Sequence, residues 1–450
     1  MRERVRRRIF PLIASVGLIV IGMYTTTWGP TLIGRTEWAL PYDLWGTLIA
    51  TTRLAHGNIG GLYAPPTGLI SLPGAAVILL PCAAVISALG LSLTIPGPHN
   101  LHPPVWLLAG PYEIALCCVT LFAADALAEQ LGVRFWKRGL LAAASAGILW
   151  SVSARWGHPE DAVALGLLLY AVTRLLPPSK ANLALLLLAP EVFVAIQSSS
   201  SNALVTALIL LAAAAYESGR LMHGGYAVVV GASLKVFPLA GFIFAAIQGR
   251  RGRAAFNAGV ALAAVLALPL LVVSSRELLQ QYQWWFRVET SDARDMLFGM
   301  SLMRQVRDWW HIDWPNWTIQ AGGTALFLLP IALRRDRWKC PSFRIEYLCS
   351  LLIYVVLFNH QAERQSFIIA ATGSVIWFVT SPRTVERGVL LALAIIGVPI
   401  VPYLVLWLVI QTELMRPAPT SAEAPRLADA DEDGPQDSRW RWSGRYRVAS

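Results

Sequence analysis

The stretch "YESGRLMHGGYAVVVGASLKVFPLAGFIFAAIQGRRGR", residues 216–253, contains one apolar run between two flanks that carry arginines. Loops rich in Lys and Arg face the cytoplasm in membrane proteins, so both flanks are predicted on the same side. One straight helix would put them on opposite sides. Lys235 and Pro238 fall at the middle of the run. The sequence therefore predicts a hairpin of two half-helices that meet at "LKVFP" (234–238), a break that membrane helices tolerate where they line a polar cavity.

The composition of the whole chain indicates an integral membrane protein. Of its 450 residues 56% are hydrophobic and 14% are charged, whereas a soluble domain carries about 25% charged residues. Apolar runs of spanning length recur along the chain, and the alternating pattern of a membrane barrel does not occur. We predict an all-α fold, a polytopic transmembrane helical bundle of about 10–13 segments that include broken helices. The expected location is the inner (plasma) membrane.

The net charge of +10 does not indicate a nucleic-acid-binding protein. The basic residues form short clusters between apolar runs, at 2–8, 134–138, 249–253 and 334–339. This is the positive-inside pattern of cytoplasmic loops, so we expect the membrane, and no nucleic acid, as a partner. The five cysteines lie in or beside apolar segments without the spacing of a metal site, and are predicted to be small buried side chains.

We predict one membrane domain over residues 1–415 and a disordered tail over 416–450, which is rich in Pro, Ala and acidic residues before it ends in a basic aromatic stretch. The side of the membrane on which the tail lies is undecided. A first outer loop is expected at 29–67 and a second outer segment at 274–316, whose tryptophans suit the membrane interface. Between residues 68 and 133 two apolar runs occur where the basic clusters require an odd number of crossings, so the crossing count there stays open.

Asp43 lies in the first outer loop, at the start of a stretch whose apolar residues have helical spacing and predict an amphipathic helix on the membrane surface. The helix dipole alone favours a carboxylate at such an N-terminus. A carboxylate among aromatic residues at the rim of a bilayer also tends to have a raised pKa, which suits a general base. The residue types leave both interpretations open.

The motif "RWGHPED" (155–161) is predicted at the outer start of a helix. Pro159 suits a first helical turn, and the two acids that follow it complement the helix dipole. One carboxylate would be enough for that purpose, however, and His158 and Asp161 share a helix face. A phosphate, a sugar or a divalent metal ion are the ligands that these residue types suit.

Lys235 and the stretch "FNHQAERQSF" (358–367) are the other polar candidates. A lysine far from either end of its apolar segment is costly in a membrane, so such charges are functional by default unless they reach the interface. At a broken helix this cation would suit the phosphate of a lipid. His360, Glu363 and Arg364 are expected either as a polar cap over a cavity or as an ordinary loop with an internal Glu–Arg pair.

In their order along the chain, these motifs resemble the GT-C superfamily of multi-pass glycosyltransferases. They are most similar to the bacterial polyprenyl-phosphate-mannose-dependent mannosyltransferases of glycosyltransferase family 87. The resemblance covers roughly residues 40–380 and rests on "RLAHGNIGGLY" (53–63) after an acid in the first outer loop, "HPED" (158–161), "LKVFP", and the late string "FNHQAERQSFIIAATGSVIWF" (358–378). The chain departs from many GT-C enzymes in having no second acid beside Asp43.

The resemblance implies an inverting transfer of a sugar from a polyprenyl-phosphate donor to a glycolipid or polysaccharide acceptor of the cell envelope, on the outer side of the membrane. Mannose is the favoured sugar and arabinofuranose the next. Asp43 would be the general base. Lys235, with His158 or Arg155, would bind the donor phosphate, whereas the sugar or acceptor would contact Glu160, Asp161, His360 and Glu363. The resemblance implies no certain cofactor, and a divalent cation is left open.

A transporter or flippase of a lipid-linked or other amphipathic substrate is the alternative function. It would share the broken helix, the lysine and a polar cavity at membrane depth. Transporters of this kind show interrupted helices in two related halves, whereas this sequence has one clear break and no internal repeat. An assembly scaffold without chemistry would leave the clustered outer polar residues unexplained.

Overall fold

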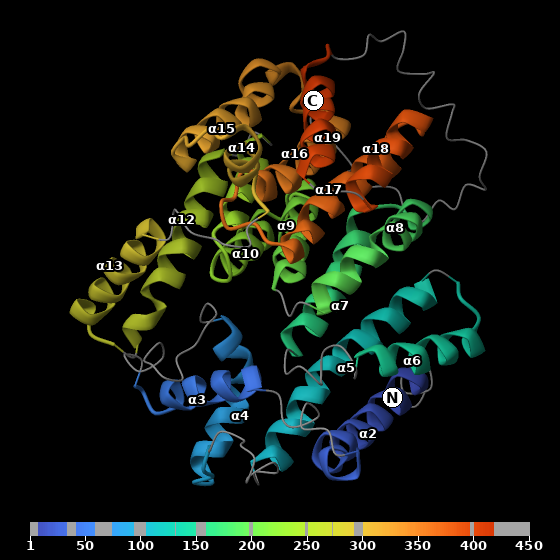
Figure 1. Cartoon of the computed structure of the whole chain (residues 1–450), viewed down its shortest axis with the longest axis vertical. Helices are drawn as coiled ribbons and strands as arrows, with labels where there is room; N and C mark the ends of the chain where they lie inside the picture. Colours follow the sequence, from blue (N-terminus) through green and yellow to red (C-terminus); the bar gives the residue numbers. More distant parts are fainter. Residues whose placement is uncertain are drawn as a thin grey trace, which may run out of the picture.

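The computed structural model describes the chain over residues 8–33, 42–58, 74–93, 105–130, 132–149, 159–197, 201–247, 251–271, 273–291, 300–396 and 400–417. Every regular element in these ranges is a helix (Figure 1). The all-α prediction is confirmed. The tail predicted from 416 onward falls almost wholly outside the described residues, and the division of the chain at 415 stays a prediction.

In chain order the helices are α2 (Ile9–Ile33), α3 (Tyr42–Ala55), α4 (Gly74–Ala88), α5 (Trp106–Gln130), α6 (Phe135–Leu149), α7 (Pro159–Leu175), α8 (Pro178–Gln197), α9 (Asn202–Glu217), α10 (Leu221–Ala232), η3 (Phe237–Gly241), α11 (Phe242–Ile247), α12 (Arg251–Ala267), η4 (Leu268–Leu271), α13 (Ser275–Ser291), α14 (Leu302–Trp310), α15 (Asn316–Leu333), η5 (Arg335–Arg337), α16 (Pro341–Leu357), η6 (Arg364–Ser366), α17 (Phe367–Thr380), α18 (Val385–Ile396) and α19 (Ile400–Met415).

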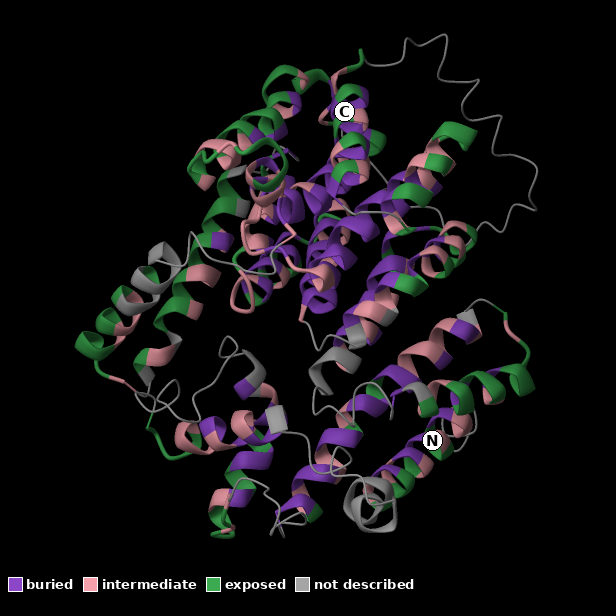
Figure 2. Ribbon diagram, in the orientation of Figure 1, coloured by how far each residue is buried: buried purple, intermediate pink, exposed green. Residues whose placement is uncertain are grey.

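The main hydrophobic core joins helices from α7 to α19, and smaller clusters hold α2 to α6 together. Helices α2 to α6 occupy the lower part of Figure 1, and the packing of α5 on α7 connects them to the rest. The buried residues concentrate where α9, α16 and α17 meet (Figure 2). The late string of the sequence therefore supplies the centre of the fold.

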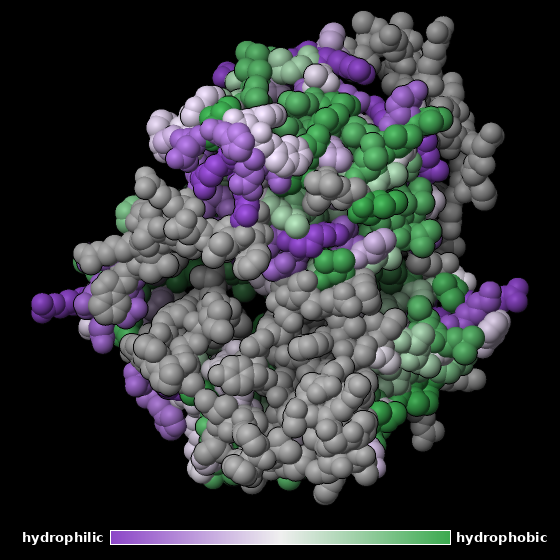
Figure 3. Space-filling model, in the orientation of Figure 1, coloured by the Kyte–Doolittle hydropathy of each residue, from purple (hydrophilic) through white to green (hydrophobic). Residues whose placement is uncertain are grey.

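The described residues contain one helix that is long and apolar enough to cross a membrane, at Trp106–Glu129, and several shorter apolar helices. Large apolar side chains point outward on many of these, among them Ile13, Leu107 and Phe256. Figure 3 shows hydrophobic residues, in green, mainly along the right side and in the upper part of the visible face. Exposed apolar surface of this extent suits contact with lipid. The number of crossings stays a prediction.

The break predicted at 234–238 is confirmed. Helix α10 ends at Ala232, the chain turns, and η3 and α11 fold back along α10. At Gly231 an added Cβ would lie 2.7 Å from the Cβ of Pro238, so only glycine allows the two arms this close. Gly241 lies against Val228 in the same way. The arms are thus antiparallel, and α10 packs along α9.

The two apolar runs between residues 68 and 133 form different structures. The first gives α4, a helix of 15 residues with Pro81 inside it, which packs mainly on α3. The second gives the 25-residue α5. Helix α3 buries Leu44, Trp45 and Leu48 against α4 and the start of α5, as its amphipathic pattern predicts.

Arginine–carboxylate pairs join the helix ends that carry the basic clusters; we call this the arginine-rich end. Arg8 and Arg138 both donate to Asp125, at 2.8 Å and 2.6 Å. Arg344, near the start of α16, holds both oxygens of Glu217 at the end of α9. The first pairs fasten the ends of α2, α5 and α6 to one another, and the last fastens the end of α9 to the start of α16.

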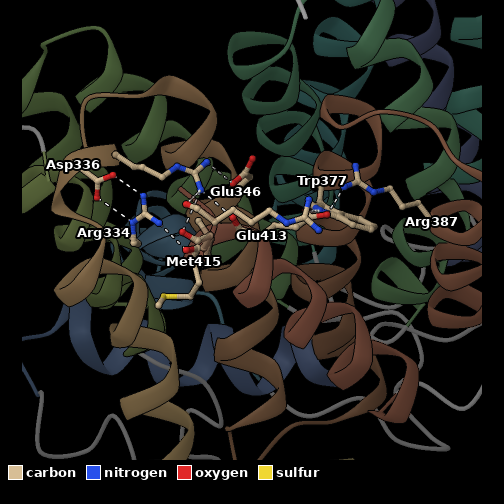
Figure 4. Close-up of polar contacts among 10 residues, drawn as sticks. Arg334, Asp336, Glu346, Trp377, Arg387, Glu413 and Met415 are labelled. Carbon is tan, nitrogen blue, oxygen red and sulfur yellow. Dashed lines mark hydrogen bonds and ion pairs between the residues drawn. The ribbon is translucent and has the colours of Figure 1, made fainter. Parts of the chain in front are cut away.

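Glu413 of α19 is the centre of a second network at this end (Figure 4). Its carboxylate accepts a hydrogen bond from Trp377 Nε1 at 2.8 Å and pairs with Arg387. Arg337 donates to the carbonyls of residues 413, 414 and 416, and Arg334 donates to that of Met415. The two arginines thus cap the last turn of α19, where carbonyls have no partner within the helix.

Candidate functional site

Lys235 lies at the tip of the broken hairpin, beside the first residue of α9. Its Nζ donates a hydrogen bond of 2.9 Å to Oδ1 of Asn202, whose side chain is buried. Because α10 runs antiparallel to α9, its C-terminal end carries the lysine to the N-terminal end of α9. That end has a partial positive charge from the helix dipole and favours anions.

Residues 359–366, which we call the cap, connect α16 to α17 and have a defined internal shape. Asn359 Oδ1 accepts the backbone N–H of Gln361 at 3.1 Å. Glu363 and Ser366 exchange hydrogen bonds as a capping box, and Gln365 donates to the Glu363 carboxylate. This carboxylate lies near enough to the Lys235 ammonium to stabilise its charge electrostatically.

Arg364 attaches the cap to α8. Its two terminal nitrogens donate to the two oxygens of Glu191 at 2.6 Å and 2.7 Å. The interpretation of an internal Glu363–Arg364 pair is therefore wrong, because the arginine pairs with a residue far away in the sequence. Tyr403 of α19 lies close enough to Glu191 and Arg364 to interact with both charges.

His360 lies on the other side of the cap, near the start of α15. Its Nδ1 is 3.5 Å from Nε2 of Gln320, which also donates to the carbonyl of Phe358 at 3.2 Å. The second ring nitrogen, Nε2, is buried and has no hydrogen-bond partner among the described residues. This nitrogen is a polar group that a substrate can satisfy.

Helix α14 adjoins the cap. The backbone N–H of Met300 donates to the carbonyl of Ala362, and Ser301 caps the helix by accepting from the N–H of Arg304. Met303 and Val306 are buried beneath it, whereas Trp309 and Trp310 are exposed. The helix exposes two indole rings in its last turn.

The model of "Glycosyltransferase family 87" matches residues 135–359, which is half of the 450 residues. The chain belongs to glycosyltransferase family 87. This is a GT-C type family, so the protein is a glycosyltransferase with a donor and an acceptor substrate. Comparisons with curated proteins and with solved structures each found no match.

The family match contains Lys235 and the start of α7 but ends where the cap begins. Among the site residues predicted for this family 87 glycosyltransferase, the structure places Glu363 and His360 in the same cap and Lys235 at the tip of the broken hairpin. Their roles stay predictions. His360 and Lys235 have no described contact with each other.

The other predicted site residues are only partly within the described residues. Asp43 is in the first turn of α3, and Glu160 and Asp161 are in the first turn of α7, which starts at Pro159 as the motif predicts. The side chains of these three acids lie outside what the structure describes, and so do Arg155 and His158 entirely. The suggestion of a metal at "HPED" therefore stays untested.

Four polar residues at the site did not emerge from the sequence: Asn202, Glu191, Gln320 and Tyr403. Glu191 carries the clearest signal, because it is a lone acid within an apolar run and charges in such runs are rarely accidental. Asn202 only continues a row of serines. Nothing in the local pattern of Gln320 or Tyr403 indicates a site.

The site of this family 87 glycosyltransferase is suited to bind an anion. The Lys235 ammonium is hydrogen-bonded to a neutral amide, and among the described residues it forms no direct ion pair. The dipole of α9 adds to its positive charge. A phosphate that departs with negative charge is a natural ligand for such a fixed cation.

Proposed function

We propose that this family 87 enzyme transfers a sugar, with mannose favoured, from a polyprenyl-phosphate donor to a glycolipid or polysaccharide acceptor of the cell envelope, with inversion at the anomeric carbon. The observation that carries the proposal is the Lys235 ammonium, held at the tip of a broken hairpin by its hydrogen bond to Asn202. This is where the phosphate of the donor would bind.

Bond breaking in this reaction requires stabilisation of the leaving phosphate. The C1–O bond breaks with its electron pair on the phosphate oxygen, where negative charge develops. A preorganised cation lowers the energy of that charge without reorganising, and Lys235 is preorganised by its bond to Asn202. His158 and Arg155 are further candidates for the same phosphate.

Bond formation requires one base. The acceptor oxygen forms the new bond to C1 while its proton passes to a carboxylate, and we assign this role to Asp43. Phosphate leaves without protonation, so no general acid is needed, in contrast to glycoside hydrolysis with its two carboxylates. The burial of Leu44, Trp45 and Leu48 fixes α3 along an apolar surface, which supports a fixed position for an acid in its first turn.

The other polar residues would contact the sugar and the acceptor. We assign Glu160 and Asp161, in the first turn of α7, and His360 and Glu363, in the cap, to this task. The unpartnered Nε2 of His360 supports its inclusion, because a hydroxyl group of a substrate would satisfy it.

The arginine-rich end would face the cytoplasm, since it gathers the basic clusters that stay inside. Helix α16 connects Arg344 at that end to the cap. Its 17 residues span about 25 Å at 1.5 Å per residue. The cap and Lys235 would then face outside, where a polyprenyl-linked sugar meets an envelope acceptor in a multi-pass protein of the plasma membrane.

The proposal is tested by sugar transfer from radiolabelled polyprenyl-phosphate-mannose to extracted envelope acceptors, in membranes with matched amounts of wild type and Asp43→Asn. We expect transfer by the wild type and loss of transfer, with donor binding retained, in the variant. Equal transfer by both would remove Asp43 from its role. No transfer by the wild type, with either the mannose or the arabinose donor, would overturn the proposed function in favour of lipid-linked substrate transport.

A further inference from the structure

The buried Nε2 of His360 is a polar atom whose role depends on the other nitrogen of the same ring. A neutral imidazole carries its hydrogen on one nitrogen, which donates, while the other nitrogen accepts. Nε2 has no hydrogen-bond partner among the described residues, so its own surroundings do not show which role it takes. The contact at Nδ1 decides this, because the hydrogen bond made by one ring nitrogen sets the state of the other.

Gln320 makes the contact at Nδ1, and a second contact fixes the direction of its side-chain amide. Its Nε2 lies 3.2 Å from the carbonyl oxygen of Phe358. A carbonyl oxygen can only accept, so the nitrogen end of the amide must face it. The same nitrogen lies 3.5 Å from Nδ1 of His360. An amide nitrogen donates through either of its two hydrogens and does not accept, so Gln320 is the donor in both contacts.

Nδ1 of His360 is therefore the acceptor, and in the neutral ring the hydrogen is on Nε2. The buried nitrogen is thus a donor that calls for an acceptor atom. The hydroxyl and ring oxygens of a sugar accept hydrogen bonds and have no charge to be neutralised, so they suit a neutral imidazole. A phosphate is better served by the ammonium of Lys235, and no contact between Lys235 and His360 is described.

The packing of α15 on the end of α16 holds Gln320 in place. Gly323 lies three residues further on the same face of α15, and a Cβ added there would overlap the ring of Phe358. Only glycine allows the helix to approach the start of the cap this closely. Thr324 donates to the carbonyl of Gln320 at 2.7 Å, and its Oγ1 lies 2.6 Å from the hydroxyl of Tyr354. These contacts give the Gln320 amide a fixed origin.

We propose that Gln320 is a positioning residue that keeps the hydrogen of His360 on Nε2, so that this nitrogen donates a hydrogen bond to a sugar oxygen of the substrate. The inference deepens the proposed function and rests on it for its kinetic readout. The oxygen belongs either to the transferred sugar or to the acceptor glycan. Varying the donor and the acceptor concentrations separately distinguishes these, since KM rises for the substrate that His360 contacts.

A double-mutant cycle tests whether the two residues act together. In the wild-type background, Gln320→Leu should lower kcat/KM about 3- to 10-fold, the loss that one misaligned hydrogen bond to a substrate causes. In His360→Ala, which lacks the ring, the same change should alter kcat/KM by no more than about twofold. Equal losses in the two backgrounds would overturn the positioning role.

The matched control is Ala321→Leu, which puts the same leucine at the next position of α15, where the side chain is exposed. Its kcat/KM should stay within about twofold of the wild type. The thiol of Cys349, fully buried in α16, monitors folding and should stay unreactive in each variant. If it reacts in Gln320→Leu, then Gln320→Met, which keeps the length of the side chain without a donor, replaces that variant in the cycle.

A second readout does not depend on sugar transfer. The seven histidines are labelled with 15N, and their ring signals are recorded from the purified protein at about pH 8, where a histidine is ordinarily neutral. The His360 signal is the one absent from His360→Ala. We expect the hydrogen on Nε2 in the wild type and in Ala321→Leu, and a mixture of both forms in Gln320→Leu. A hydrogen on Nδ1 in the wild type, or an unchanged His360 signal in Gln320→Leu, would overturn the inference.

The two readouts separate this inference from the proposed function. A wild type that transfers no sugar would overturn the function, yet a His360 hydrogen that stays on Nε2 only in the presence of Gln320 would still support the positioning role. Normal sugar transfer by Gln320→Leu would overturn the inference and leave the function intact.

Discussion

The two ends of this helical protein treat their charged groups differently. At the arginine-rich end, the Glu413 carboxylate accepts a hydrogen bond from Trp377 and forms an ion pair with Arg387, and Arg337 donates to three backbone carbonyls. At the cap, Lys235 binds a neutral amide and a buried nitrogen of His360 has no partner among the described residues. The polar groups of the first end mostly satisfy one another, whereas those of the second keep capacity for a ligand. Similar residue types thus serve structure at one end and, on our proposal, bind a substrate at the other.

Of the substitutions that test this contrast, replacing Lys235 should have the largest effect, a loss of sugar transfer. Lys235→Gln keeps the length and the polarity of the side chain but removes the charge, so we expect transfer to fall about 10²- to 10³-fold, as when one preorganised group that stabilises a leaving charge is lost. The melting temperature should hardly change. Initial rates with radiolabelled donor measure the effect, and a rate within threefold of the wild type would contradict it.

Replacing Glu413 should have the opposite result, a loss of stability without a loss of sugar transfer. Glu413→Gln leaves Arg387 without its counter-ion and should lower the free energy of unfolding by about 2–3 kcal/mol, less than for a fully buried pair because Arg387 keeps some contact with water. Transfer per folded molecule should be unchanged. Thermal unfolding in detergent tests this, with Glu386→Gln, an exposed neighbour on α18, as the control that should match the wild type.

Gly231→Ala should disturb the hairpin itself. Its Cβ would lie 2.7 Å from Pro238, whereas a Cβ on Gly225, in the same helix, would meet nothing within 4 Å. Helix propensity affects both variants alike, so Gly231→Ala should be less stable than Gly225→Ala by about 1–3 kcal/mol. Denaturant unfolding of the two variants gives the difference. Equal free energies of unfolding would show that the two arms of the hairpin can move apart without loss of stability.

The smallest effect is expected from Asp336. Hydrogen bonds from Arg334 hold the pKa of this exposed carboxyl below its usual value. A carboxyl with a lowered folded pKa adds stability above its unfolded pKa of about 3.9, and this is lost as the pH falls through the folded pKa. Asp336→Asn should therefore be slightly less stable than the wild type at pH 7 in low salt, and the difference should shrink as the pH falls below about 3.9. A deficit that grows in acid would contradict the assignment.

The sequence predicted those features that depend on neighbours along the chain. The break at Lys235 and Pro238 follows from two basic flanks around one apolar run. The amphipathic α3 and the start of α7 at Pro159 follow from local spacing and from the fixed φ of proline. The same reasoning separated the cap from the apolar helices on either side of it.

Contacts between distant segments did not follow from the sequence. Arg364 pairs with Glu191, 173 residues away, and Lys235 reaches Asn202 rather than an acid. Such partners depend on how α8, α9 and α17 pack together, which a periodicity cannot specify. The crossing count between residues 68 and 133 could not be predicted for the same reason, since only packing shows that the short α4 lies on α3.

Arg334 and Arg337 have one more consequence through the carbonyls that they bind at 413–416. By closing the last turn of α19 they fix the point at which the polypeptide leaves the bundle, at the end remote from the cap. On our assignment of sides, that exit is inside the cell. The approach of a bulky glycan to the other end of the bundle would then not meet the chain at this exit.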